Sequence, residues 1–325
     1  MCATGAALSP RGCAMTEPLS FGPAGQAVLV TGATGFVGRQ LVAALLADGQ
    51  HVFALTRDPA NALRVLGPSV HCIGALTELA GKSRIDIVVN LAGARILGHR
   101  WTEARKAALR ASRVALTQRL VAWIATAAVK PRLLLSASAI GYYGVQPQGV
   151  HEELTEASPP QSIFMSQLCR EWEEAAGQAA AHGVQVACTR FGLVLGHGGA
   201  LPSMLLPIKL GAGGPLGGGR QHLSWIHVED LLRALAWLAR REEPVQGAWN
   251  FTAPRCATQG EFARTAAGLL HRPALLPTPG WPVRLLLGEQ ADLVLEGQCV
   301  VPKRMLDGGF DFRYPDLKEA LRSLV

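Results

Sequence analysis

The sequence lacks a long apolar run, and it has few charged and few aromatic residues. Of its 325 residues, 49% are apolar, 17% are charged and 6% are aromatic. This balance excludes an intrinsically disordered chain, which is poor in apolar residues and rich in charge. The longest apolar candidate, Leu120 to Ile140, is interrupted by Lys130, Pro131 and Arg132, so no segment approaches the roughly 18 residues of a membrane helix. We therefore expect a soluble globular protein with no membrane span.

Cysteine pairs with metal-binding or redox spacing are also absent. The seven cysteines form no Cys-x-x-Cys pair and are odd in number, so they predict neither a disulfide framework nor a zinc site. The histidines His99, His222 and His227 lack metal-ligand spacing, and we expect no metal. A reducing, cytoplasmic location follows as the default. Residues 1–26 are rich in small residues, without the basic start and apolar core of a signal peptide, and we expect a disordered N-terminal extension.

Acidic residues are scarce in one segment, and this accounts for the net charge of +7. Residues 95–130 contain eight basic residues and a single acid, Glu103. Lys106, Arg110 and Arg113 recur at i, i+4 and i+7, which places them on one face of a helix. No aromatic residue lies between Lys106 and Arg119 for base stacking, so we do not expect nucleic acid as a partner. A solvated face, or contact with a phosphate or a partner helix, is favoured instead.

The sequence repeats an apolar run, a turn and a helical stretch. We expect strands over residues 26–31, 51–56, 69–73, 86–91, 132–138, 184–190 and 248–252, and helices over residues 38–48, 102–129, 161–182 and 228–241. Short apolar strands that alternate with helices are typical of a parallel sheet covered on both faces. The fold class predicted is therefore α/β, with a doubly wound parallel sheet.

The strongest local signal is a strand, a glycine turn and a helix in that order, Ala27-Val-Leu-Val-Thr31-Gly32-Ala-Thr-Gly35-Phe-Val-Gly38. Gly32 would make the tight turn, Gly35 would let the backbone approach a pyrophosphate, and Gly38 would let the helix pack on the strand. The phosphates would lie at the helix N-terminus. The expected cofactor-binding residues here are Gly32, Thr34, Gly35, Phe36, Val37 and Gly38. The alternative is a tight turn without a ligand.

The end of the second strand bears on which dinucleotide would bind. The residues there are Thr56-Arg57-Asp58-Pro59. A carboxylate at this position accepts hydrogen bonds from a ribose diol, whereas an arginine accommodates a 2′-phosphate. Asp58 before Pro59 is also typical of a helix N-cap, and Arg57 can fork onto a phosphate. We favour NADP, with NAD as the alternative; Arg57 as an ordinary solvent-facing residue is the competing interpretation.

Two further strand ends carry candidate site residues. Asn90-Leu-Ala-Gly93 ends the fourth strand with small residues, and we expect Leu91, Ala92 and Gly93 to border the cofactor. Ser138 ends the fifth strand and is followed by Tyr142 and Tyr143. We expect these three residues to face the substrate as the catalytic candidates. The alternative for Ser138 is that its hydroxyl only satisfies backbone groups at a turn.

The glycine turn, Asn90-Leu-Ala-Gly93, the strand ending at Ser138 and Ser224-Trp-Ile-His227-Val-Glu-Asp230 together resemble the extended short-chain dehydrogenase/reductases of the nucleotide-sugar epimerase group. More narrowly, the sequence resembles the atypical "epimerase family" branch, with its cell-division-inhibitor-like members. That narrower likeness is carried by Arg100-Trp101-Thr102, Gly141-Tyr-Tyr-Gly144, Trp172-Glu173, Gly213-Gly-Pro-Leu-Gly217 and Leu295-Glu-Gly-Gln298. The resemblance covers about residues 27–325.

This resemblance implies a Rossmann domain, a C-terminal substrate lobe and a nicotinamide cofactor. We expect residues 27–191 plus 227–252 to form the Rossmann NADP-binding domain. Residues 192–226 plus 253–325, which are rich in glycine and proline, would form the substrate-binding lobe over the carboxyl edge of the sheet. Arg220, Gln221 and His222 are further candidates for substrate contact in that lobe.

The sequence departs from the family at its catalytic pair. The family uses a tyrosine and, four residues later, a lysine on the helix after the fifth strand. Between Gly144 and Met204 the sequence has neither residue type. The preferred register places Met165 and Cys169 at the two positions, and a shift by one residue places Ser166 and Arg170 there. Tyr314 and Lys318 have the right spacing but lie far from this helix in the sequence.

Two functions remain open from the sequence. The leading hypothesis is an NADP-binding oxidoreductase or epimerase-like enzyme with a small, phosphate- or nucleotide-bearing substrate. The alternative is a catalytically weak or inactive nucleotide-sensing regulatory protein, since the missing pair suits either. We also expect a homodimer, because the basic helix over residues 102–129 and the acidic helix over residues 161–182 correspond to the pair that dimerises many family members.

Overall fold

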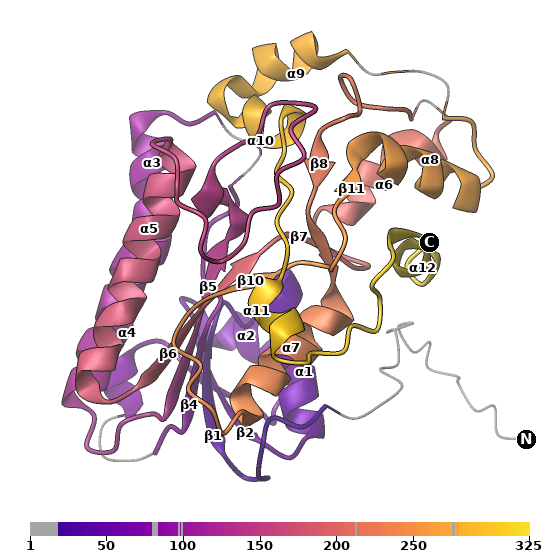
Figure 1. Cartoon of the computed structure of the whole chain (residues 1–325). Coiled ribbons are helices and arrows are strands. Elements are labelled where there is room, and N and C mark those ends of the chain that lie inside the picture. Colours follow the sequence, from indigo (N-terminus) through magenta and orange to yellow (C-terminus); the bar gives the residue numbers. More distant parts are fainter. Residues whose placement is uncertain are drawn as a thin grey trace, which may run out of the picture.

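The protein is built on one seven-stranded parallel sheet with the strand order β10-β6-β5-β4-β1-β2-β3 (Figure 1). Its computed structural model describes residues 19–79, 84–96, 98, 100–211, 213–274, 277 and 279–325. The strands are β1 (Ala27–Thr31), β2 (His51–Leu55), β3 (His71–Ile73), β4 (Ile87–Asn90), β5 (Leu133–Ala139), β6 (Gln185–Phe191) and β10 (Gly247–Phe251). All seven segments predicted as strands enter this sheet, so the α/β prediction is confirmed.

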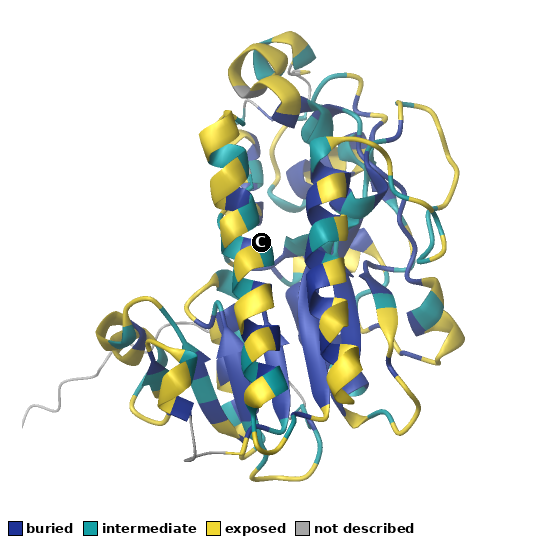
Figure 2. Ribbon diagram, turned by 90° about the vertical axis from the view of Figure 1, so that its left-hand side faces the viewer, coloured by how far each residue is buried: buried dark blue, intermediate teal, exposed yellow. Residues whose placement is uncertain are grey.

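Helices cover both faces of the sheet. The apolar faces of α1 (Phe36–Ala47) and α7 (Val228–Arg240) pack on one side, through residues such as Leu41 and Leu235. On the other side, α4 (Leu116–Thr126) and α5 (Phe164–Gly177) contribute Leu120 and Ala176 to a second cluster. Figure 2 shows the strands dark blue behind helices whose outward faces are yellow. Burial of apolar side chains on both faces is what holds this doubly wound sheet together.

The basic segment predicted as one helix is divided into three parts. It consists of α3 (Glu103–Arg110), a π-helical turn, η2 (Ala111–Ala115), and α4. Thr102 caps α3 with its hydroxyl, which accepts a hydrogen bond from the Arg105 N–H. A π turn widens the helix locally and is frequent at functional sites. Here it carries Arg113, whose side chain is buried rather than solvated.

A second group of elements packs around its own apolar cluster, which includes Trp225, Phe262 and Leu321. The elements are β7 (Leu193–Leu195), α6 (Leu201–Lys209), β8 (His222–Leu223), β9 (Trp225–His227), β11 (Ala257–Thr258), α8 (Gln259–Leu269) and α12 (Leu317–Arg322). Together with α9 (Gly280–Leu287) and α10 (Asp292–Leu295), several of them lie at one end of the sheet (Figure 1). The division into two domains remains a prediction.

The remaining short elements connect these parts. They are α2 (Pro59–Leu66), η1 (Leu76–Leu79), η3 (Ile140–Tyr143), η4 (Gln178–His182), η5 (Gly288–Ala291) and α11 (Lys303–Asp307). None of the helices in the described part of the chain is long and apolar enough to cross a membrane.

Residues before residue 27 already pack on the core. Phe21 is 2% exposed and belongs to the core on the α1 side, and its N–H donates a hydrogen bond to the Asp48 carboxylate over 2.7 Å. The expected extension over residues 1–26 therefore does not apply to residues 19–26. Residues 1–18 lie outside the described part.

One pair of cysteines corrects the prediction from the sequence. Cys256 and Cys299 form a disulfide that joins the start of β11 to the segment after α10. The two residues are separated by 43 positions in the sequence. The packing of the C-terminal segment brings them together, and no cysteine-spacing motif predicts this pairing. Cys72, Cys169 and Cys188 are free, while Cys2 and Cys13 lie outside the described residues.

Candidate functional site

The glycine turn after β1 is a cradle closed on one side by backbone. Gly32 has a φ of +67°, which L side chains rarely adopt. A Cβ on Gly32 would lie 2.8 Å from the carbonyl carbon of Leu91 and 2.9 Å from the Ala92 nitrogen. The turn therefore lies directly against the residues that follow β4. Leu91 and Ala92, both predicted to border the cofactor, are brought to the turn by this contact.

Helix α1 starts at this turn with its N–H groups uncapped by side chains. Gly35 is the N-cap, the first turn contains no acidic residue, and no side-chain oxygen caps it. A Cβ on Gly38 would lie 2.8 Å from the Ala33 Cα, so glycine is required for the helix to pack on the turn. Uncapped N–H groups and the positive end of the helix dipole together favour an anion at this point.

A buried polar network fixes the strand ends around the cradle. The Thr31 hydroxyl donates to the Asn90 amide oxygen over 2.7 Å and accepts the Ala92 N–H over 3.1 Å. The Asn90 amide nitrogen donates to the hydroxyls of Thr117 and Ser136, over 2.8 and 3.2 Å. One side chain thus ties β1, β4, β5 and α4 together at the carboxyl edge of the sheet.

The remaining predicted residues of the turn differ in their surroundings. Thr34 is exposed and Val37 is half-buried. The Phe36 ring packs against Gly196, Gly198 and Gly199, where an added Cβ would lie 2.5 to 2.9 Å from ring carbons. The glycines after β7 therefore make room for this ring, which links the cradle to the second group of elements.

At the end of β2, the two candidate residues have different surroundings. Asp58 is the N-cap of α2, and its carboxylate accepts the Asn61 N–H over 3.0 Å. Pro59 follows as the first helical residue. Arg57 is exposed, and among the described residues the structure records no ion pair for it. The Asp58 carboxylate is therefore engaged as a helix cap, whereas the Arg57 side chain is exposed at the strand end.

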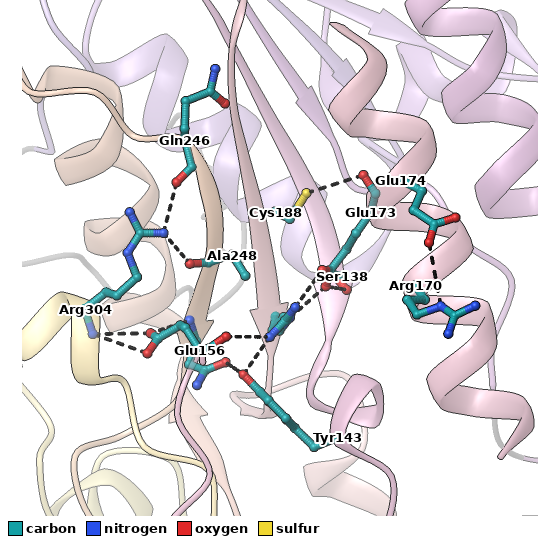
Figure 3. Close-up of polar contacts among 12 residues, drawn as sticks. Ser138, Tyr143, Glu156, Arg170, Glu173, Glu174, Cys188, Gln246, Ala248 and Arg304 are labelled. Atoms are coloured by element: carbon teal, nitrogen blue, oxygen red, sulfur yellow. Dashed lines mark hydrogen bonds and ion pairs between the residues drawn. The ribbon is translucent and has the colours of Figure 1, made fainter. Parts of the chain in front are cut away.

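The three catalytic candidates meet around a buried arginine that the sequence analysis missed. Ser138 on β5 donates its hydroxyl hydrogen to Glu173 on α5 over 2.6 Å, and the two side chains point toward one another in Figure 3. Arg190 on β6 donates to the same carboxylate through Nε and Nη2, over 2.8 and 2.7 Å. The Arg190 and Glu173 side chains are only 4% and 14% exposed. Two parallel N–H···O bonds fix the relative orientation of the guanidinium and the carboxylate in such a bidentate, buried pair.

Tyr142 and Tyr143 contact the same guanidinium in different ways. Arg190 Nη1 donates to the Tyr143 hydroxyl over 2.8 Å, and that hydroxyl donates to Asn250 over 2.6 Å. Burial raises the pKa of Tyr143 to about 12. The centroid of the Tyr142 ring lies 3.4 Å from the guanidinium carbon of Arg190, and Tyr142 is half-buried. Tyr143 is thus a buried anchor, whereas Tyr142 retains an accessible edge.

That accessible edge faces a groove between α5 and the last two strands of the sheet, β6 and β10. The groove has a volume of about 470 Å³ and is lined by Tyr142, Arg170, Glu173, Glu174, Gly177, Val186, Cys188, Gln246, Gly247 and Ala248. Figure 3 shows Cys188, Glu173 and Arg170 along it. Tyr142 and Glu173, the hydrogen-bond partner of Ser138, therefore both line this groove.

Helix α5 turns the positions of the missing catalytic pair toward β5. Met165 and Cys169 are buried and pack with Ala139 and Tyr142. Arg170 is exposed and pairs with Glu174, while Ser166 is buried and donates to the Gly141 carbonyl over 3.1 Å. The register with Met165 and Cys169 is therefore the one in which both residues are buried near the end of β5, whereas in the other register Arg170 faces solvent. Burial raises the pKa of Cys169 to about 12, so this thiol is not a general base near neutral pH.

Other polar candidates lie away from the cradle. Tyr314 stacks on His227 with ring centroids 3.9 Å apart, and its N–H donates to Asp230. Gln221 is buried and donates to the carbonyls of Leu216 and Val294, and the His222 ring contacts His151. Arg220 is exposed. His99 lies outside the described residues.

Comparison with known proteins now places this architecture. Residues 28–251 match the NAD dependent epimerase/dehydratase family, and residues 278–324 match a domain of unknown function, DUF1731. The chain belongs to the NAD dependent epimerase/dehydratase family. It is therefore an atypical member of the extended short-chain dehydrogenases, as the motifs indicated.

Two relatives cover nearly the whole of this epimerase family chain. The chain is 40% identical over 306 residues to the "Epimerase family protein SDR39U1 homolog, chloroplastic" of Arabidopsis thaliana, covering 92% of this chain and 86% of that protein. It is 37% identical over 302 residues to the "Epimerase family protein YfhF" of Bacillus subtilis, covering 92% and 97%.

Solved structures show the same fold. The human epimerase family protein SDR39U1, crystallised with NADPH, superposes with a TM-score of 0.80 at 36% identity, over 92% of this chain and 99% of that one. MoeE5 in complex with UDP-glucuronic acid and NAD superposes with a TM-score of 0.72 at 25% identity, over 92% and 97%.

The ion pair at the catalytic candidates gives a test of stability. Glu173→Gln would leave the buried Arg190 without a counter-charge, and loss of one partner of such a pair costs about 3–5 kcal/mol. We expect the free energy of unfolding in urea to fall by that amount. Glu174→Gln is the matched control, since Glu174 is 66% exposed in its side chain and should change stability by less than about 0.5 kcal/mol. Equal effects of the two substitutions would contradict the assignment.

Proposed function

We propose that this protein binds NADP(H) and acts as an oxidoreductase or epimerase-like enzyme on a small, phosphate- or nucleotide-bearing substrate, without the tyrosine–lysine pair of its family. The observation that carries the proposal is the cradle, in which Gly32 and Gly38 permit close backbone contact and α1 presents uncapped N–H groups.

We assign the three parts of the dinucleotide to different described residues. The N–H groups of Phe36 and Val37 would hold the pyrophosphate, because the Gly35 N–H already donates to the Gly32 carbonyl over 3.0 Å. Arg57 would meet the adenosine ribose and its 2′-phosphate. Gly93, which is exposed just after Leu91 and Ala92, would border the nicotinamide half. When bound, the nicotinamide supplies or accepts a hydride.

The ligands of related proteins of known structure also support this assignment. The human relative was crystallised with NADPH, which favours NADP over NAD here. MoeE5 was crystallised with UDP-glucuronic acid and NAD, which supports a nucleotide-bearing substrate class for this fold. The exposed Arg57, with Asp58 occupied as a helix cap, points the same way.

The first prediction concerns the choice of cofactor. The unmodified protein should bind NADPH more tightly than NADH, because Arg57 contacts the 2′-phosphate that only NADPH carries. Arg57→Ala should weaken NADPH binding about tenfold or more, equivalent to about 1.4 kcal/mol, and leave NADH nearly unchanged. Fluorescence titration of the bound nicotinamide measures both affinities. Arg64→Ala, an exposed arginine on the neighbouring helix α2, is the control. Equal affinities of the unmodified protein for the two cofactors would return Asp58 to the ribose role.

The acid–base groups of the site are weak. Met165 cannot exchange a proton, and the Ser138 hydroxyl is committed to Glu173. Tyr143 holds its proton too tightly, since its pKa is about 12. Tyr142 is the candidate with an accessible edge, and Arg190 lies on its ring. Of the predicted group Ser138, Tyr142 and Tyr143, Tyr142 is therefore the residue left for proton transfer, without the lysine that assists it elsewhere in the family.

The second prediction follows from these weak groups. Oxidation of alcohols and reduction of ketones should be slow, since general-base help is worth about 10²–10⁴ in rate. Reduction of an activated double bond, which needs no strong base, should be faster. Stopped-flow measurement of NADPH oxidation across ketones, sugars and activated alkenes separates the cases. Fast ketone reduction that survives Ser138→Ala, Tyr142→Phe and Tyr143→Phe would show that the active site lies elsewhere.

A nucleotide-sensing protein without turnover is the second candidate function. The missing catalytic pair and the buried hydroxyls of Ser138 and Tyr143 favour it. Tight NADPH binding with no oxidation of the bound cofactor by any substrate of that panel would select this candidate.

The cytoplasmic location expected from the cysteines remains a prediction, and the Cys256–Cys299 disulfide argues against it.

The third prediction is a homodimer through the outer faces of α4 and α5. The charge argument for it is weaker than the sequence indicated, because Arg110 pairs with Glu171 of the same chain over 2.8 Å. The exposed outer residues of both helices, such as Arg119 and Glu174, remain available for a partner. Sedimentation at high micromolar concentration should give twice the chain mass of 34.4 kDa. A single-chain mass would contradict the dimer.

A further inference from the structure

Arg113 is a buried cation beside the cofactor-bordering loop. It lies in the π turn between α3 and α4 and is 8% exposed. Its guanidinium carbon would be 2.9 Å from a Cβ on Gly93, so it lies directly on the backbone of this residue. Gly93 itself is exposed and follows the two residues that touch Gly32. A fixed positive charge therefore reaches the edge of the cradle.

This cation differs from its neighbours on the same helix in having no acidic partner. Lys106 pairs with Glu103 and Glu289, and Arg110 pairs with Glu171. Among the described residues, no ion pair includes Arg113. Its Nη2 donates to the Ala94 carbonyl over 2.8 Å and its Nη1 to the Ser112 hydroxyl over 3.3 Å.

Burial of such a charge is costly unless something compensates it. Burial lowers the pKa of Arg113 to about 10, which still leaves it protonated near neutral pH. The Trp172 ring lies 5.3 Å from its guanidinium carbon, and a carbonyl and a hydroxyl accept two of its five N–H groups. A buried cation without a carboxylate beside it is a candidate to bind an oxygen-bearing ligand, because such a ligand would accept its remaining N–H groups.

Arg113 lies beside the helix that lacks the family lysine. Its guanidinium carbon is 5.3 Å from the ring centroid of Trp172 on α5, the helix on which Cys169 takes the lysine position. Arg113 therefore contacts both that helix and the backbone of Gly93. An arginine from the neighbouring helix places a cation where α5 itself has none.

We propose that Arg113 binds the nicotinamide-nucleotide half of the dinucleotide, by donating hydrogen bonds to its ribose oxygens. This inference rests on the proposed NADP(H) binding. It assigns to Arg113 a ligand-binding role in place of the solvated helix face that its spacing predicts. The contact would be the same for NADPH and NADH, because the two differ only at the adenosine ribose.

The experiment compares three probes on four proteins. NADPH, NADH and adenosine 2′,5′-bisphosphate, which lacks the nicotinamide half, are titrated into the unmodified protein, Arg113→Gln, Arg113→Lys and Arg119→Gln. Arg119→Gln is the matched control, since Arg119 is exposed on the adjoining helix α4. Competition with a fluorescent nucleotide reports the affinity of the bisphosphate, and thermal unfolding reports whether each variant is folded.

The expected result is specific to the nicotinamide half. Arg113→Gln should weaken NADPH and NADH alike by about tenfold or more, as for loss of hydrogen bonds from a charged donor, and leave the bisphosphate unchanged. Arg113→Lys should retain the bond to Ala94 but lose the fork, and weaken both dinucleotides about fivefold. It decides the matter alone if Arg113→Gln does not fold.

Two outcomes overturn the inference. One is a folded Arg113 variant that binds both dinucleotides as tightly as Arg119→Gln does. The other is an equal loss of affinity for the bisphosphate, which would indicate a general distortion of the cradle. Failure of the unmodified protein to bind NADPH at all would instead contradict the proposed function, so the two failures are distinguishable.

Discussion

The buried amide of Asn90 is the interaction on which the candidate site depends. Its oxygen and nitrogen satisfy hydroxyls on β1, β5 and α4 within a region that excludes water. A buried amide left without its hydrogen bonds costs about 1–3 kcal/mol. Moving β1, β5 or α4 away from β4 would break one of these bonds, so the network holds the three elements next to β4. Because the Thr31 hydroxyl also accepts the Ala92 N–H, the same network keeps the loop after β4 in contact with Gly32. The cradle is a consequence of this arrangement.

Two buried arginines then give the site its electrostatic character. Arg190 is neutralised by Glu173 in a closed, fully bonded pair, and burial of that kind stabilises one arrangement of β5, β6 and α5. Arg113 has no such partner among the described residues, and its charge remains directed at Gly93. The first arginine therefore serves the fold around the catalytic candidates, and the second is the one left to meet a ligand.

Much of this architecture could be predicted from the sequence, because it depends on local patterns. Apolar runs separated by turns predicted all seven strands, and the spacing of Gly32, Gly35 and Gly38 predicted the cradle. What the sequence could not reveal depends on packing between distant segments. A period of 3.6 residues puts Arg113 on the face of Lys106 and Arg110, but the π turn at residues 111–115 alters that face and buries it. Glu173 and Arg190 are 17 residues apart and meet only when α5 lies across β5 and β6. Trp172-Glu173 was a signal within the resemblance, but it did not say what the carboxylate contacts.

The central claim is that this fold keeps a complete dinucleotide cradle while replacing the catalytic pair beside the nicotinamide. A crystal structure of the protein with NADPH tests it most directly. The claim predicts density for the pyrophosphate on the N–H groups of Phe36 and Val37, and for the nicotinamide ribose next to Gly93, with Met165 and Cys169 on the facing helix. Density for the dinucleotide elsewhere on the protein, or no density at saturating NADPH, would contradict it.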